Sequence, residues 1–206
     1  MAQALVAFGE LYPAVEVLSS DGYRSDLISR LIAGELDFAL LSTTQDLLNM
    51  QTQAISNEAL VVVGHSDTLA GRSSLRGSEL ADFHLVLPSR LKSIRNLIDA
   101  QFGLQGLTLR PQLEVDSLQS SLHIASRLGW LSIVPPTALS SEMFGGALQS
   151  AFLIEPLIKR HVVVAWPPHK SLAPPVQLFI QILAGILGKI PGVDITDDMP
   201  RPAVDG

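Results

Sequence analysis

The chain has 206 residues, of which 47% are hydrophobic and 17% charged, and it contains no cysteine. This length and composition allow a sizeable hydrophobic core, so they exclude a disordered tail and a fibrous protein. With 14 Lys and Arg against 20 Asp and Glu, the formal net charge is -6, which disfavours binding of nucleic acid by this chain itself. The lack of cysteine excludes disulfides and thiolate-bound metals.

The first part of the chain is predicted to alternate between helices and strands. Helical spacing of apolar residues predicts helices over residues 2–11 and 23–32, the second ending at Gly34. Short apolar runs predict strands over 15–18 and 36–41. This alternation is typical of a parallel sheet with helices on its faces, so we expect an α/β fold.

The same alternation continues to residue 187. Strands are expected at 59–64, 84–87, 113–115, 131–134, 152–158 and 162–166. Helices are expected near Ser78, over 94–102, over 118–128 and over 172–187, where Pro174 and Pro175 are tolerated in the first turn. From Lys189 onward the chain has three prolines, four aspartates and no periodicity, which predicts a disordered or loose extension.

Hydroxyl side chains follow several of the predicted strands. Ser42 and Thr43 follow the strand at 36–41, Ser89 follows the strand at 84–87, and Ser117 follows the strand at 113–115. Ligands settle at the carboxyl ends of parallel strands, and helix N-termini favour anions. Arg90 adds positive charge beside Ser89. The alternative interpretation is that Ser89 and Ser117 only cap the helices that follow them.

Signals for other chemistry are weak. The five histidines are scattered, with no pair at metal-ligand spacing, and no GxSxG, GxGxxG or GxxxxGK[ST] motif occurs. We therefore expect no catalytic residues, no metal and no cofactor. Trp130 and Trp166 lie in strand-like runs, which favours places in the core or in the wall of a cleft over a base-stacking role.

The ordered segments resemble the effector-binding domain of LysR-type transcriptional regulators. The resemblance rests on FGELYPAVEV, LISRLIAGELDFALL, EALVVVGHSDTLAG, LADFHLVLPSR, EVDSLQSSLHIASRLGWLSIVPPTAL and IEPLIKRHVVVAW, which together extend from Ala2 to about Leu187. Within that family, the LPSR and EVDSL segments are most similar to regulators of nitrogen assimilation.

The resemblance implies a type 2 periplasmic-binding-protein-like fold, in which two crossover strands join two α/β lobes. Lobe I would comprise residues 1–65 and 164–188, lobe II residues 66–163, and a flexible tail residues 189–206. A small effector, often a carboxylate, would bind in the cleft between the lobes. The expected contacts are Ser42 and Thr43 on the first wall, Ser89, Arg90 and Ser117 on the second, and Ile133 near the floor.

The resemblance also implies parts that would precede Met1, namely a winged helix-turn-helix, a linker helix and the first strand of lobe I. We therefore expect a ligand-sensing domain that forms a homodimer, or a tetramer in the full-length protein, and contacts DNA only through the N-terminal domain.

The start of the chain has no basic region typical of a signal peptide, and no apolar stretch is long enough to cross a membrane, so a cytoplasmic location is expected. The alternatives are a solute-binding protein of the same fold and an enzyme built on it.

Overall fold

A computed structural model describes residues 1–42, 47, 49–139 and 146–196. The chain divides into two compact units, the first formed by residues 1–57 and 161–206 and the second by residues 58–160. Strands β2 (Gln51–Ala59) and β9 (Lys159–Trp166) each begin in one unit and end in the other. The chain therefore crosses between the units twice, as expected for two lobes joined by crossover strands.

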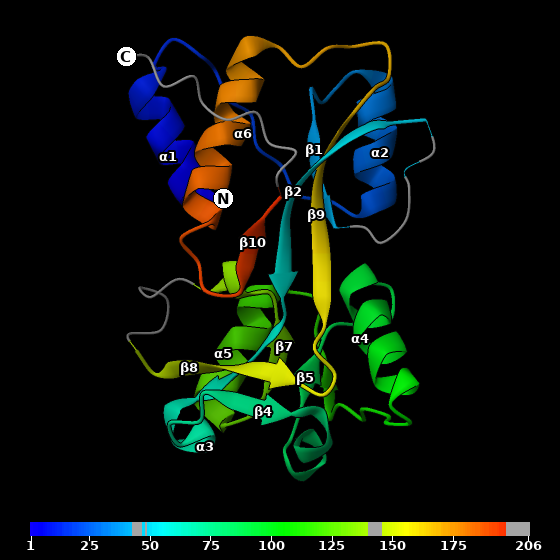
Figure 1. Cartoon of the computed structure of the whole chain (residues 1–206), viewed down its shortest axis with the longest axis vertical. Coiled ribbons are helices and arrows are strands. Elements are labelled where there is room, and N and C mark those ends of the chain that lie inside the picture. Colours follow the sequence, from blue (N-terminus) through cyan, green and yellow to red (C-terminus); the bar gives the residue numbers. More distant parts are fainter. Residues whose placement is uncertain (43–46, 48, 140–145, 197–206) are drawn as a thin grey trace. The chain divides into compact units, whose positions relative to one another are not determined.

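The first unit is a four-stranded sheet with helices on both faces. Its strand order is β1 (Ala39–Ser42), β9, β2 and β10 (Val193–Ile195). Figure 1 shows helices α1 (Ala2–Leu11) and α6 (Pro174–Leu187) on one side of these strands and α2 (Arg24–Ala33) on the other.

The two faces of β9 explain this layering. Val164 packs in one apolar cluster with residues of α1 and α6, whereas Val163 and Ala165 pack in another with Leu31 of α2. Successive side chains of a strand point to opposite faces, so the continuous apolar run of β9 provides core residues for both helix layers.

Two predictions for the first unit are wrong. Residues 15–18 form no strand, and Val17 and Leu18 are 47% and 84% exposed. The sheet is also not simply parallel, because β1 runs antiparallel to β9, with Ala39 opposite Ala165. Helix–strand alternation predicts parallel neighbours only when consecutive strands pair, and here the partner of β1 comes from far along the chain.

The second unit is built around β3 (Val61–His65). This strand pairs antiparallel with β7 (Ser132–Val134) and with β8 (Leu148–Ile154), and β8 pairs parallel with β4 (Ser74–Arg76). Strands β5 (Val86–Leu87) and β6 (Leu113–Glu114) form a separate parallel pair. The helices are α3 (Ser66–Leu69), α4 (Ser93–Leu104) and α5 (Leu118–Leu128), with 3₁₀ turns at Gly77–Asp82 and Pro136–Ala138.

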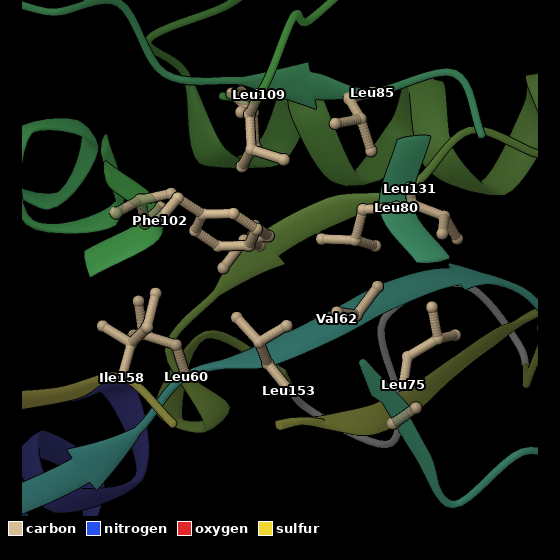
Figure 2. Packing of buried hydrophobic residues seen from close by; sticks show 14 of the residues in the cluster. Leu60, Val62, Leu75, Leu80, Leu85, Phe102, Leu109, Leu131, Leu153 and Ile158 are labelled. Atoms are coloured by element: carbon tan, nitrogen blue, oxygen red, sulfur yellow. The ribbon is translucent and has the colours of Figure 1, made fainter. Parts of the chain in front are cut away.

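The core of the second unit lies on both faces of β3. Val62 packs with Leu60, Leu153 and Phe102 of α4 in the cluster that Figure 2 shows. Val61 and Val63 pack on the opposite face with Leu122 of α5. Burying each such side chain stabilises the fold by about 1.5–3 kcal/mol, as an upper estimate.

The tail prediction is wrong for the residues up to 196. Val193–Ile195 forms β10, Val193 is buried, and Thr196 donates its backbone N–H to the Ile55 carbonyl at 3.0 Å and its Oγ1 to the Ala54 carbonyl at 2.8 Å. Val193 and Ile195 are too few to show periodicity in a segment rich in proline and aspartate. They nevertheless suffice to add β10 as an edge strand of the first unit's sheet. Residues 197–206 lie outside the described residues.

Candidate functional site

Two strand-to-helix turns of the second unit lie side by side. The parallel pairing places Leu87 opposite Glu114, and the backbone N–H of Val115 donates to the Leu87 carbonyl at 2.9 Å. Both strands therefore end at the same edge. There the backbone N–H of Ser89 donates to Oδ1 of Asp116 at 2.9 Å, which brings the Ser89 turn against the turn that holds Ser117.

Asp116 adds a negative charge to this edge. The Ser89 hydroxyl and the Ser89 backbone N–H, in that order, lower the pKa of the Asp116 carboxyl below its ordinary value, and the charge of Lys92 acts in the same direction. The Asp116 carboxylate thus already accepts the hydrogen bond of the Ser89 N–H, which the sequence had suggested as a donor to an anionic ligand. An anion that binds this turn has to displace Asp116 from Ser89.

The two serines differ in their capping roles. Ser117 is the N-cap of α5, and its Oγ accepts a hydrogen bond from the backbone N–H of Ser120 at 3.3 Å, as the capping interpretation predicts. Ser89 is not a cap, because α4 begins at Ser93 with Lys92 at its N-cap. The Ser89 Oγ is buried instead beside the Asp116 carboxylate, whose pKa it lowers.

The arginine that supports the Ser89 turn is Arg95, whose side chain is 1% exposed. Its Nη1 donates to the Pro88 carbonyl and to Glu114 Oε1, each at 2.9 Å, and its Nε donates to Asp99 Oδ1 at 2.9 Å. Burial alone would lower the pKa of the guanidinium, but the hydrogen bonds and charges of the two carboxylates raise it overall. Arg95 therefore fixes the end of β5 to the end of β6.

Arg90, the predicted cation, lies at the surface. It is 72% exposed, and its Nε is 3.6 Å from Asp99 Oδ2. The spacing of Arg95 and Asp99 by four residues on a helix is the sequence signal that would have indicated the buried pair. No comparable signal indicated Asp116, because an aspartate before a helix is ordinarily expected to cap it.

The remaining predicted residues lie in both units. Ile133 is 1% exposed on β7, opposite Val62, within the core of the second unit. Ser42 is the half-buried last residue of β1 in the first unit, opposite Val162. Thr43 lies outside the described residues. The structure thus brings together Ser89 and Ser117 at one edge and joins Asp116 to them.

The described part of the chain has neither a membrane-spanning helix nor a cluster of metal ligands. None of its helices combines the length and the apolar character needed to cross a bilayer. In the same residues, no three His, Asp or Glu side chains gather as a set of metal ligands.

The sequence model of the LysR substrate binding domain matches residues 1–187. The chain belongs to this family. Solved LysR regulatory domains have the type 2 periplasmic-binding-protein-like fold, so the predicted fold class and family are confirmed.

Relatives of this LysR domain are transcriptional regulators. It is 25% identical over 179 residues to the nitrogen assimilation regulatory protein nac of Escherichia coli, covering 85% of the chain and 57% of that protein. It is 22% identical over 174 residues to the RuBisCO operon transcriptional regulator of Acidithiobacillus ferrooxidans, covering 84% and 56%. The chain therefore spans little more than half the length of these curated relatives.

Solved structures with the same fold include three LysR-family proteins. HinK of Pseudomonas aeruginosa superposes with a TM-score of 0.78 at 19% identity, covering 92% of this chain and 66% of that one. The reduced OxyR regulatory domain of the same organism gives 0.75 at 17%, covering 89% and 90%. The Synechocystis CcmR regulatory domain in complex with 2-PG gives 0.74 at 23%, covering 90% and 89%.

Proposed function

We propose that this LysR domain is the ligand-sensing part of a DNA-binding transcriptional regulator and that its effector is a small anion, such as a carboxylate. The observation that carries the proposal is the pair of turns that holds Ser89 and Ser117 at the carboxyl ends of β5 and β6. Open α/β sheets bind ligands at such ends.

The family resemblance implies further contacts with the effector. We propose Ser89, Arg90 and Ser117 as its contacts in the second unit and Ser42 and Thr43 as its contacts in the first, and we propose that Ile133, which lies in the core of the second unit, supports the site from behind. The complex of the CcmR regulatory domain with 2-PG supports a small-molecule effector for this fold. No reaction of the effector is proposed, because the relatives are regulators.

The wider role follows from the relatives. We propose that the domain acts in the cytoplasm as a homodimer, or as a tetramer in a full-length regulator, and that a separate N-terminal domain contacts DNA. Val6 and Leu11 of α1 are 62% and 64% exposed, which gives the first unit apolar surface for such an assembly. Effector binding would then change the arrangement of the DNA-binding domains.

A thermal-shift screen tests the effector proposal. The ligands are 2-PG, small carboxylates, phosphate and sulfate, and the proteins are the wild type, Ser89→Ala and Arg90→Ala. Ser126→Ala is the matched control, because its hydroxyl donates only to the His123 carbonyl on the exposed side of α5. A ligand at 100 times its Kd adds about 2.7 kcal/mol to the free energy of unfolding.

The proposal predicts at least one stabilising anion whose effect is reduced in Ser89→Ala and Arg90→Ala and kept in Ser126→Ala. Stabilisation that is equal in all four proteins would contradict the assignment of these residues. A cooperative melt with no stabilising anion in the whole set would contradict the proposed class of effector.

A further inference from the structure

The two turns of the candidate effector site carry as much negative as positive charge. Their charged side chains are three cations and three carboxylates within residues 88–99 and 113–117, namely Arg90, Lys92, Arg95, Asp99, Glu114 and Asp116. The buried cation Arg95 is bonded to Asp99 Oδ1 and Glu114 Oε1, each at 2.9 Å. Its positive charge is therefore already matched by two carboxylates within the same turns.

The other two cations also face carboxylates. The Nε of Arg90 lies 3.6 Å from Asp99 Oδ2, and the charge of Lys92 acts on the carboxylate of Asp116. A ligand that brings only negative charge would leave these turns with more carboxylates than cations. Because like charges in one site repel each other, this surplus lowers the affinity of a plain anion.

The carboxylate of Asp116 stays close to Ser89 even when a ligand displaces it. On one side of Asp116, the backbone N–H of Val115 donates to the Leu87 carbonyl at 2.9 Å. On its other side, Ser117 is the N-cap of α5. These contacts hold the backbone of Asp116, so only its side chain can turn away from the Ser89 N–H. The displaced carboxylate therefore remains beside the bound ligand.

These features narrow the class of ligand. The ligand has to provide an acceptor for the Ser89 N–H and a positive group for the displaced Asp116. A carboxylate with a neighbouring ammonium group provides both, and it leaves the charges of the two turns balanced. We propose that the ligand of this site is such a zwitterion, with the two groups on adjacent carbon atoms as in an amino acid. This inference rests on the proposed function and narrows its carboxylate class.

The test compares pairs of ligands that differ only in the ammonium group. The pairs are L-alanine and propionate, L-glutamate and glutarate, and L-phenylalanine and 3-phenylpropionate. An NMR titration of the Ser89 backbone amide follows binding to the wild type, Asp116→Asn and Asp82→Asn. Asp116→Asn removes the charge and keeps an oxygen that can accept the Ser89 N–H. Asp82→Asn is the matched control, because it removes the same charge from an exposed residue at the end of the 3₁₀ turn Gly77–Asp82.

In at least one pair, the amino acid should bind the wild type at least about fivefold more tightly than the matched acid, which is the factor for one charge pair about 4 Å apart in water. In Asp116→Asn this ratio should fall to about one, because the acid escapes a repulsion and the amino acid loses an attraction. Asp82→Asn should keep the ratio of the wild type.

Two results would overturn the inference in different ways. Equal binding of both members of every pair that binds, or a ratio that is unchanged in Asp116→Asn, would overturn the zwitterion class and leave the proposed effector site in place. No saturable shift of the Ser89 amide with any of these compounds up to about 10 mM, in the wild type or in Asp116→Asn, would overturn the effector site and the inference together.

Discussion

At the scale of single residues, Asp116 determines the electrostatics of the candidate effector site. Its carboxylate accepts the Ser89 N–H, and the Ser89 hydroxyl is the largest cause of its lowered pKa. A carboxyl with a lowered pKa in the folded state stabilises the fold above its unfolded pKa of about 3.9, and this contribution is lost as the pH falls through the folded pKa.

The first prediction concerns the variant Asp116→Asn. The wild type should melt at a higher temperature than Asp116→Asn at neutral pH, because only the carboxylate makes a charge-assisted bond to the Ser89 turn. This difference in Tm should shrink as the pH falls below about 4. Thermal melts between pH 7 and pH 2.5 measure it, and Ser89→Ala should reduce the pH dependence. A difference in Tm that is the same at every pH would contradict the assignment.

The second prediction compares the two arginines that contact Asp99. Arg95→Met removes a buried guanidinium that joins two carboxylates and a carbonyl. It should lower the free energy of unfolding by about 3 kcal/mol. This value is the lower end for a broken buried ion pair, because Glu114 is 45% exposed. Arg90→Met breaks only an exposed pair and should cost less than about 1 kcal/mol. Urea denaturation measures both values, and equal losses would show that Arg95 is not the support of this turn.

Sequence reasoning found part of this site. The rule that ligands bind where strands end pointed to Ser89 and Ser117, and the structure places those two turns side by side. The rule could not find Asp116, since its bond to Ser89 depends on which strands pair. It also favoured the exposed Arg90 over Arg95, because the burial of a long cationic side chain is decided by tertiary packing.

At the scale of elements, tight contact between segments limits which side chains fit. The 3₁₀ turn that begins at Gly77 packs against the end of β8. A Cβ atom at Gly77 would lie 2.7 Å from the Glu155 carbonyl oxygen and 3.0 Å from the ring of Phe102. Both distances are shorter than ordinary contacts, so only glycine fits without movement of the backbone.

The third prediction therefore pairs two glycine variants. Gly77→Ala should destabilise the protein by about 1–3 kcal/mol through overpacking. Gly103→Ala is the control, since no atom lies within 4 Å of its Cβ position on α4, and it should stabilise the helix by up to about 1 kcal/mol. Chemical denaturation of both variants provides the test, and a neutral effect of Gly77→Ala would contradict the packing described.

Helices were predicted better than strands. The apolar spacing of α1, α5 and α6 is visible in the sequence, and Gly34, where the second helix was expected to end, adopts the left-handed conformation with φ of 75°. Strand β2 was missed because Gln51, Thr52 and Gln53 begin it. Its polar residues become strand residues only because β9 and β10 pair with it.

At the scale of the whole molecule, the order of segments was more informative than any single motif. The family resemblance predicted two lobes, whereas local alternation alone predicted a parallel sheet for the first lobe. The antiparallel pairing of β1 with β9 joins residues more than 100 positions apart. Local patterns contain no information about such pairing, but the ordered set of family segments does.

The central claim is that this LysR domain binds a small anion at the turns of Ser89 and Ser117. The most direct measurement is an NMR titration of the backbone amides with the anion that stabilises the protein most in the thermal screen. We predict saturable shifts that are largest at Ser89, Asp116 and Ser117, because the ligand would replace the bond between Ser89 and Asp116. Saturable shifts elsewhere with none at these three amides would contradict the claim.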